Sequence, residues 1–271
     1  MEWVWRLAEA VKARRARSPG VGWCLALPSY ESCLQDVLPR EGGVAVDVGA
    51  YIGRHTLAYA RAVGTQGRVI AVEPQADNFK LLQRNVAVNG LSQVQCVLVA
   101  LGAENGETCL RFDRETSTAS LVRDLPLRQR VPLMTMDALL AFVGVDKVDF
   151  IKIDAEGSEL EILDGSEVTL SQSPGPRLLI EVHSRSRRLA ATGCPVADWL
   201  TARGYSITEL VDGKRRFHLA CPGPHRTSSK TFGEQSATRG PTGSRLPGAT
   251  FPPFFDASAG AESRHECRRN V

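Results

Sequence analysis

Residues 44–56 read VAVDVGAYIGRHT. The apolar run VAVDV predicts a strand that ends near Asp47, and Gly49, Ala50 and Gly53 follow it before a helical stretch. Small residues in such a turn let backbone N–H groups approach a ligand closely, because few side-chain atoms stand in the way. The stretch therefore indicates a strand, a cofactor-binding loop and a helix, although similar turns also occur as structure alone.

The next apolar run, RVIAVEP, ends in Glu73. An acidic side chain at the carboxyl end of this strand can accept hydrogen bonds from both hydroxyls of a ribose. A nicotinamide-dependent dehydrogenase would need G-x-G-x-x-G to seat a pyrophosphate on the helix N-terminus, whereas this loop reads GAYIG. The pattern favours a nucleoside ligand without a pyrophosphate, such as S-adenosylmethionine.

From Gly42 to about Ala220, short apolar runs alternate with amphipathic helical stretches, which is typical of a mostly parallel sheet with helices on both faces. CLRF (109–112) predicts an antiparallel excursion, and VPLMT (131–135) precedes a helix that Asp137 could cap. The remaining runs predict strands: VAVDV (44–48), RVIAVE (68–73), VQCVLVA (94–100), DFIKID (149–154), RLLIEVH (177–183) and a closing hairpin of YSITEL (205–210) with RRFHLA (215–220).

Composition divides the chain into three parts. Residues 1–23 predict an N-terminal amphipathic helix or extension, and residues 24–221 the folded domain. Residues 222–271 predict a disordered tail, because 18 of these 50 residues are Gly, Pro or Ser and too few are apolar to build a core. Within the folded part, residues 21–221 carry 21 Lys or Arg against 24 Asp or Glu, so we expect no nucleic-acid partner.

The seven cysteines form no C-x-x-C pair, which indicates reduced thiols rather than a zinc site. No apolar run reaches 18 residues, so we expect no transmembrane helix. These features predict a soluble, cytoplasmic protein.

With these features in place, the sequence resembles the FkbM-type methyltransferases, a branch of the class I S-adenosylmethionine-dependent enzymes, from about Gly42 to His183. The motifs that carry the resemblance are VDVGAYIGRHTLAYA, GRVIAVEPQADNFKLLQRNVAVNGL, VALGAENGE, MTMDALL, VDFIKIDAEGSELEILDGS and LLIEVH, and IKIDAEGSELEILDGS (151–166) is the most specific. The resemblance implies a Rossmann-like α/β fold with a seven-stranded, mostly parallel sheet and S-adenosylmethionine across the carboxyl ends of the strands.

The resemblance also implies roles for single residues in cofactor binding. Gly49, Ala50 and Gly53 would line the methionine portion, with Asp47 at the end of the strand before them. Glu73 would hold the ribose, and Ala100 and Leu101 would lie near the adenine. Two departures leave the side-chain contacts open: Tyr51 stands where the family often has Asn, and LGAENGE stands where the family usually has Ser-Asp after the Leu.

The block DFIKIDAEGSELE brings Asp154 to the end of its strand, and Ser158 with Glu161 forms an S-x-x-E pattern that predicts a capping box. We expect Asp154 to contact the methionine amino group or the acceptor. Glu156 would orient the substrate or a metal, or both carboxylates would only stabilise the helix N-terminus. Lys152 is expected to pair with a neighbouring carboxylate.

Glu181 and His183 lie two residues apart at the end of a strand and so point to the same side of the sheet. We assign Glu181, His183 and Asp154 to the catalytic set, with His183 as a general base toward an acceptor hydroxyl. A structural histidine that binds a loop carbonyl is the alternative. The same three residues could gather a divalent cation, but no ligand spacing requires one, and we expect no metal.

The sequence therefore predicts S-adenosylmethionine-dependent methylation, most simply of an oxygen on a small-molecule, sugar or lipid acceptor. Two alternatives stay open: an NAD(P)-dependent oxidoreductase on a similar sheet, and a non-catalytic binding module of the same fold. The acceptor itself cannot be identified, because residues 102–135 and 184–200, which would shape its site, carry no decodable motif. An Arg185, Arg187 and Arg188 cluster could attract an anionic acceptor or be a solvated loop.

Overall fold

A computed structural model describes residue 34 and residues 37–113, 118–172, 174–183, 194–212 and 215–223. All of them belong to one compact unit; a second unit, Pro224–Arg264, lies outside the described residues. The predicted N-terminal helix, the arginine cluster at 185–188 and all but the first two residues of the predicted tail also lie outside the described residues.

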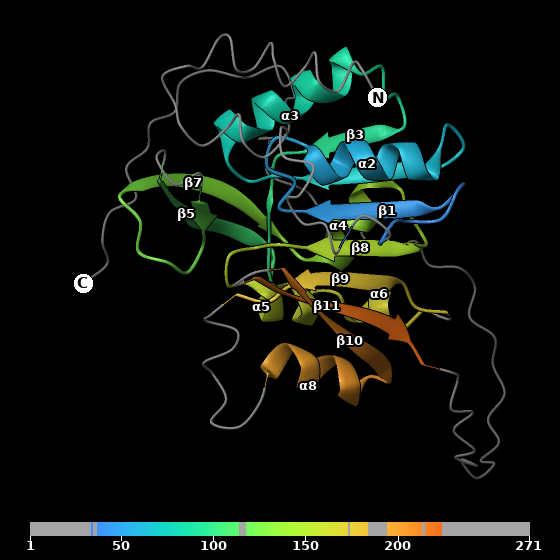
Figure 1. The fold of residues 1–271 in the computed structure, drawn as a ribbon. Helices are drawn as coiled ribbons and strands as arrows, with labels where there is room; N and C mark the ends of the chain where they lie inside the picture. The colour runs from blue at the N-terminus through green and yellow to red at the C-terminus, as the bar shows by residue number, and fades with distance from the viewer. Residues whose placement is uncertain are drawn as a thin grey trace, which may run out of the picture. The chain divides into compact units, whose positions relative to one another are not determined.

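The main sheet has seven strands in the order β10-β11-β9-β8-β1-β2-β3 (Figure 1). All neighbouring pairs from β9 to β3 are parallel, and β11 is antiparallel to both of its neighbours. The strands are β1 (Val44–Val48), β2 (Arg68–Val72), β3 (Val94–Val97), β8 (Phe150–Ile153), β9 (Arg177–Glu181), β10 (Tyr205–Asp212) and β11 (Arg215–Pro222). The expected seven-stranded, mostly parallel sheet and its closing hairpin are confirmed.

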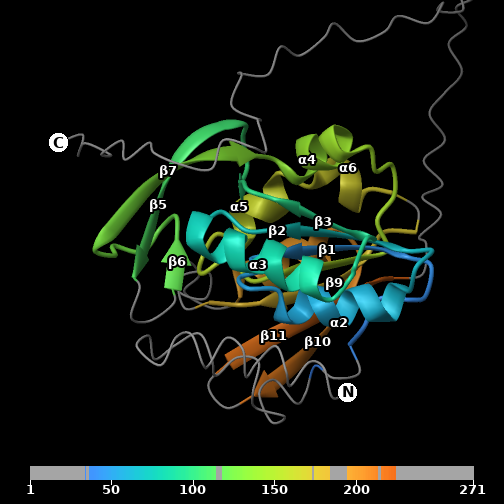
Figure 2. The same ribbon diagram turned by 90° about the horizontal axis from the view of Figure 1, so that it is seen from above.

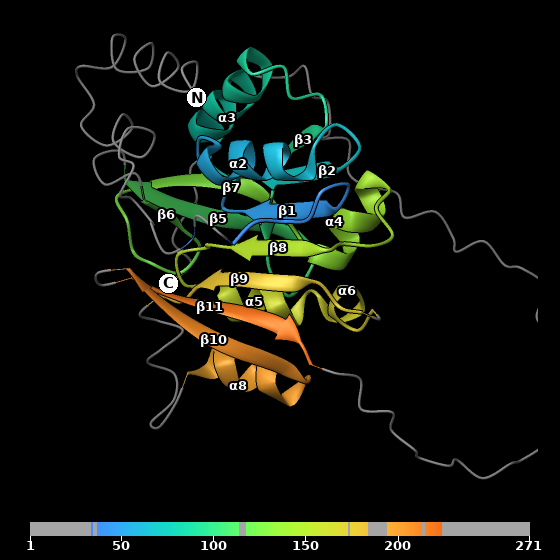
Figure 3. The ribbon, with the colours of Figure 1, turned by 45° about the vertical axis from the view of Figure 1, so that its right-hand side comes forward.

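Helices cover both faces of this sheet because successive strand residues point to opposite sides. In β1, Ala45 joins a core cluster with Tyr59 of α2, whereas Val46 joins the cluster that contains Leu139 of α4. Figure 2 shows α2 and α3 on one side and α4, α5 and α6 on the other; α8 packs beside β10 (Figure 3). The helices are α2 (Arg54–Val63), α3 (Ala76–Val88), α4 (Met136–Val143), α5 (Glu159–Asp164), α6 (Glu167–Leu170) and α8 (Pro195–Ala202).

A second sheet of four strands lies at the end of the main sheet toward which the arrows of β1 and β8 point (Figure 1). Its order is β4-β7-β5-β6, made of β4 (Ala100–Leu101), β5 (Gly106–Asp113), β6 (Thr118–Ser120) and β7 (Leu127–Met134). The antiparallel excursion predicted from CLRF is therefore confirmed, and it is longer than expected.

The prediction of one strand over 94–100 was wrong. The chain leaves the main sheet after Val97, and Ala100 and Leu101 pair instead with Leu133 and Met134 of β7. A continuous apolar run is compatible with burial in either sheet, so its composition could not reveal the change of partner.

Two predicted helix caps were also wrong. Thr135 caps α4 by accepting a hydrogen bond from the Ala138 N–H, while Asp137 instead accepts from the backbone of α6. Ser158 precedes α5 but its side chain makes no capping bond. Its backbone (φ −103°, ψ 20°) is not in the extended conformation that lets an N-cap side chain reach back to the helix.

None of the helices within the described residues combines the length and the apolar character that a membrane span requires.

Candidate active site

The chain bends sharply after β1. The N–H groups of Gly49 and Ala50 both donate to the carbonyl oxygen of Val72, at 3.0 Å each, which ties the bend to β2. Gly49 has φ +72°, and a Cβ atom there would lie 1.9 Å from the carbonyl oxygen of Asp154. Only glycine fits this close approach between the bend and the end of β8.

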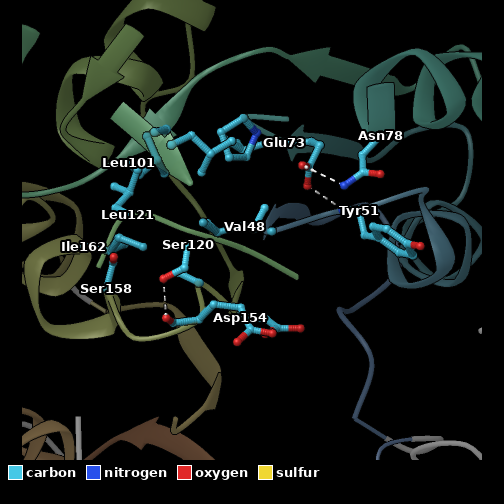
Figure 4. A pocket seen from close by; sticks show the side chains of 18 of the residues that line it. Val48, Tyr51, Glu73, Asn78, Leu101, Ser120, Leu121, Asp154, Ser158 and Ile162 are labelled. Atoms are coloured by element: carbon cyan, nitrogen blue, oxygen red, sulfur yellow. Dashed lines mark hydrogen bonds between the residues drawn. The ribbon is translucent and has the colours of Figure 1, made fainter. Parts of the chain in front are cut away.

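A cavity of about 240 Å³ lies beside this bend, between the carboxyl ends of the main strands and the second sheet (Figure 4). Its volume is just below the range of roughly 300–1,000 Å³ that is typical of small-molecule sites. Strands β2 and β8 lie on opposite sides of β1, so the order in which strands are added to the sheet changes direction at β1. Ligands of open α/β sheets bind at such switch points.

Five of the nominated residues line the cavity: Gly49, Glu73, Ala100, Leu101 and Asp154. The other five are not among its lining residues: Asp47, Ala50, Gly53, Glu181 and His183. Further lining residues, which were not nominated for the cofactor, come from both sheets and from α5 and include Tyr51, Asn78, Val99, Leu110, Ser120, Leu121, Glu156, Ser158, Ile162 and Arg215.

Glu73 lies at the cavity wall and is 4% exposed. Its carboxylate accepts hydrogen bonds from the N–H groups of Tyr51 (2.8 Å) and Gln75 (3.0 Å), and the Asn78 side chain is 3.5 Å away (Figure 4). Burial raises the pKa of Glu73 to about 7, although the two backbone hydrogen bonds act in the opposite direction. Each carboxylate oxygen has two lone pairs, so Oε2, which accepts only from Tyr51, can accept a further hydrogen bond from a ligand, and a ligand bond to Oε1 would replace the long contact with Asn78.

The part of the cavity between Leu101 and Ile162 is mostly apolar (Figure 4). Ser158 is the exception, because its hydroxyl is buried without a hydrogen-bond partner. Buried hydroxyls are nearly always satisfied, so this one marks a position where a polar edge of a ligand would fit.

Lys152 stabilises the bend without lining the cavity. Its Nζ atom lies 3.4 Å from Asp47 Oδ1 and 3.4 Å from Asp154 Oδ2, and donates to the Gly49 carbonyl at 3.1 Å. Asp47 is fully buried and also accepts from the Thr56 hydroxyl at 2.6 Å. The expected pairing of Lys152 is confirmed, and Asp47 contacts Lys152 rather than lining the cavity.

His183 faces a group of carboxylates at the edge of the cavity. Its Nε2 atom is 3.7 Å from Asp154 Oδ1, 3.6 Å from Glu156 Oε2 and 3.7 Å from Glu181 Oε1. Its Nδ1 atom is 2.7 Å from the carboxylate of Glu159, whose side chain is fully buried. Burial lowers the pKa of His183, but the bond to Glu159 and the surrounding negative charges outweigh it and raise the pKa to about 9. A protonated imidazole cannot accept a proton, so this charge state does not suit the expected general-base role at neutral pH.

Glu181 is held by Arg215, whose guanidinium donates to both carboxylate oxygens. Burial raises the pKa of Glu181, as does the negative charge of Asp154, while Arg215 lowers it. Arg215 also lines the cavity. The hairpin of β10 and β11 therefore contributes a cation to the same site.

Glu156 joins the second sheet to the end of β8. It has φ +51°, which is uncommon for a residue with a side chain, and Tyr51 has φ +53°. The Glu156 carbonyl accepts a hydrogen bond from the Ser120 hydroxyl at 2.8 Å, and its carboxylate pairs with Arg123 at 2.9 Å. Backbone conformations of this kind concentrate at functional sites, and here two of them flank one cavity.

The sequence analysis did not nominate Ser120, Leu121 or Arg215 for the site. Arg215 meets Glu181 because β11 pairs with β9, where Phe217 lies opposite Glu181. Ser120 and Leu121 reach the cavity through the second sheet. These are long-range pairings, and no local motif signals them.

The strand order, with one antiparallel strand next to the edge and a cavity at the switch point, defines the fold of the class I methyltransferases. A solved structure with this fold is the precorrin-6y C5,15-methyltransferase from Geobacter metallireducens, with a TM-score of 0.50 and 11% identity, covering 78% of this chain and 96% of that one. The model of the methyltransferase FkbM domain matches residues 47–207. The chain belongs to the FkbM methyltransferase family, as its resemblance predicted.

Two individual relatives are each less than 30% identical to this chain. The chain is 29% identical over 153 residues to Methyltransferase 1 of Beauveria bassiana, covering 48% of this chain and 61% of that protein. It is 27% identical over 147 residues to the hexuronic acid methyltransferase AglP of Haloferax volcanii, covering 54% and 58%. The chain thus spans less than two thirds of these curated relatives. The solved structure of an FkbM methyltransferase from Methylobacillus flagellatus has 22% identity and a TM-score of 0.48, with 65% of this chain and 43% of that chain covered.

Proposed function

We propose that this protein binds S-adenosylmethionine in the cavity beside Glu73 and transfers its methyl group to an oxygen of a small-molecule, sugar or lipid acceptor. The observation that carries the proposal is an acidic side chain at the end of β2 that lines a cavity next to a glycine bend. Membership of the FkbM methyltransferase family supports it and does not favour an oxidoreductase.

The residues present suit the nucleoside part of this cofactor. Glu73 offers two carboxylate oxygens for the ribose hydroxyls. Ala100, Leu101 and Ile162 provide an apolar surface for a flat base, and the buried Ser158 hydroxyl provides a hydrogen-bond partner for its polar edge. The roles of Glu73, Ala100 and Leu101 are those that the family resemblance implied, and Ser158 is an addition.

The methionine portion is proposed to lie along Gly49 toward Asp154. Asp154 and Glu156 line this end of the cavity, and their negative charges favour a cationic ligand. Ala50, Gly53 and Asp47 are proposed to act by shaping and supporting the bend. Gly53 has φ +97° and begins α2, so it sets the direction in which the chain leaves the bend.

S-adenosylmethionine supplies a methyl group already activated on a sulfonium, so the protein must mainly place the acceptor in line with it. Asp154, Glu181 and His183 stand where the acceptor would approach, and we assign them the task of binding and orienting it. The name of the Haloferax relative, a hexuronic acid methyltransferase, supports a sugar-like acceptor.

Calorimetry with S-adenosylmethionine and with its demethylated product tests the proposal. We expect wild type to bind both, and Glu73→Ala to lose at least about tenfold in affinity, because each ribose hydrogen bond to a charged acceptor contributes roughly 1.5–3 kcal/mol. Glu107→Ala, at an exposed carboxylate on β5, is the matched control. Equal binding by the Glu73 variant and the control would remove the ribose assignment; no binding by wild type would remove the proposed function.

A further inference from the structure

We propose that Asp154, Glu181 and His183 form a site for one divalent transition-metal cation, and that this cation binds the reacting hydroxyl of the acceptor. The second half of this inference rests on the function proposed above. Among the described residues, these three bring one possible ligand atom each to within 4.8 Å of the others. They come together because β8 and β9 are parallel neighbours whose carboxyl ends meet at one edge of the sheet.

The distances leave room for an ion. His183 Nε2 lies 3.7 Å from Asp154 Oδ1 and 3.7 Å from Glu181 Oε1. Both separations exceed the range of about 2.7–3.2 Å for an N–H···O hydrogen bond. Two ligands bonded at about 2.1 Å to a tetrahedral cation lie roughly 3.5 Å apart. The three side chains are therefore spaced as the ligands of one cation would be, at distances longer than direct hydrogen bonds.

The buried Glu159 fixes the imidazole of His183. Its carboxylate lies 2.7 Å from Nδ1 and also accepts the Gly157 N–H at 2.9 Å, so it is held on both sides. With the Nδ1 proton donated to Glu159, Nε2 faces the gap between it and the two carboxylates, and a cation that binds there would displace the proton that Nε2 carries in its absence. Histidines that bind metals almost always donate their other ring N–H to a carboxylate or carbonyl in this way.

Each of the two carboxylates is held by a neighbouring cation, Lys152 or Arg215. Asp154 directs Oδ2 to Lys152 at 3.4 Å and Oδ1 to His183. Glu181 gives Oε2 to Arg215, and its Oε1 accepts from Arg215 Nε at 2.8 Å but keeps a second lone pair. Each proposed ligand is thus oriented before any cation binds, which reduces the entropy that binding would cost.

Asp154 connects this cation site to the cavity, since it lines the cavity and is also one of the three proposed ligands. Three protein ligands leave coordination positions open, as catalytic metal sites do. A hydroxyl bound there would lose its proton more readily. The proton passes to water, the acceptor oxygen forms a bond to the methyl carbon, and the bond from carbon to sulfur breaks, giving a methyl ether and the neutral thioether product.

Binding of Mn²⁺ alone to the chelator-treated full chain tests the site, with free Mn²⁺ followed by electron paramagnetic resonance. We expect one Mn²⁺ per chain for wild type and for Glu209→Gln, a control at an exposed carboxylate paired with Arg216. His183→Ala and Glu181→Gln should bind at least about tenfold more weakly, and Glu159→Gln about 10–100-fold more weakly. Circular dichroism identifies any variant that fails to fold. In that case wild type is compared with Glu181→Gln, because glutamine is nearly the same size as the glutamate it replaces.

Absence of Mn²⁺ binding by wild type, or equal binding by wild type and the folded variants, would overturn the cation site and leave a protonated His183 among carboxylates. S-adenosylmethionine titrated into the same metal-free protein separates the two proposals. Retained cofactor binding without Mn²⁺ binding rejects only the cation site, whereas Mn²⁺ binding without cofactor binding rejects the function proposed for the cavity.

Discussion

At the scale of single residues, the charge of Glu73 decides how the proposed cofactor binds. A carboxylate accepts hydrogen bonds from two ribose hydroxyls, whereas a protonated carboxyl group keeps fewer acceptor sites and loses its charge. Because burial places the pKa of Glu73 at about 7, the balance between these forms falls in the physiological range.

We therefore expect the affinity for S-adenosylmethionine to fall as the pH decreases through about 7. The ionised fraction of a group with this pKa decreases roughly tenfold from pH 8 to pH 6, and the affinity should follow it. Glu73→Gln should bind more weakly at pH 8 and show no such dependence. Calorimetry at pH 6, 7 and 8 measures both, and a parallel pH dependence in the two proteins would show that another group is responsible.

Substitution of Gly49 tests whether the bend requires its close approach to Asp154. Gly49→Ala should lower the free energy of unfolding by about 3 kcal/mol or more, because a methyl group would overlap the Asp154 carbonyl and the backbone has a positive φ. Gly90→Ala is the matched control, since Gly90 has φ +63° but nothing within 4 Å of its added Cβ, and should cost only about 1–2 kcal/mol. Urea denaturation of the three proteins gives the comparison; similar losses in both variants would mean that the close approach to Asp154 is unimportant.

At the scale of elements, the strands of the main sheet could be predicted because burial on both faces gives nearly continuous apolar runs, as in β2, where every residue after Arg68 is apolar and buried. The carboxylate at the end of β2 and the glycine bend after β1 could be predicted for the same reason, since both follow such runs directly. Contacts between elements could not be predicted. Ser120 and Arg215 reach the cavity through pairings whose partners are distant in the sequence, and Asp137 bonds a helix some thirty residues further on.

Asp137 joins two helices of the same face. Its carboxylate accepts from the N–H groups of Val168 (3.0 Å) and Thr169 (2.8 Å) and from the Thr169 hydroxyl (2.6 Å). Asp137→Ala should lower the free energy of unfolding by about 1–2 kcal/mol, the usual cost of losing a helix cap. A double-mutant cycle with Thr169→Val, measured by chemical denaturation, should give a coupling energy of about 0.5 kcal/mol or more; full additivity would show that the two side chains do not interact.

At the scale of the whole molecule, the cavity depends on two sheets that are built differently. The main sheet supplies the bend, Glu73 and Asp154, while Leu110 and Ser120 of the second sheet, with Leu121 directly after β6, supply the opposite wall. The main sheet is stabilised by apolar side chains that pack on both of its faces. The second sheet has its own smaller core cluster around Leu110 and Val131, but its Leu101 and Met134 pack into the core of the main sheet. The two walls of the cavity are therefore joined by one shared core.

The core clusters of the described residues extend only from Leu34 to Ala220. The family match ends earlier still, at residue 207. A chain that ends at Gly223 should therefore keep the thermal midpoint and the S-adenosylmethionine affinity of the full chain, because the composition of residues 224–271 predicts too few apolar side chains to contribute to a core. Differential scanning fluorimetry and calorimetry on the two proteins measure both quantities. A lower midpoint would show that residues 224–271 stabilise the domain, and weaker cofactor binding at an unchanged midpoint would show that they take part in the site.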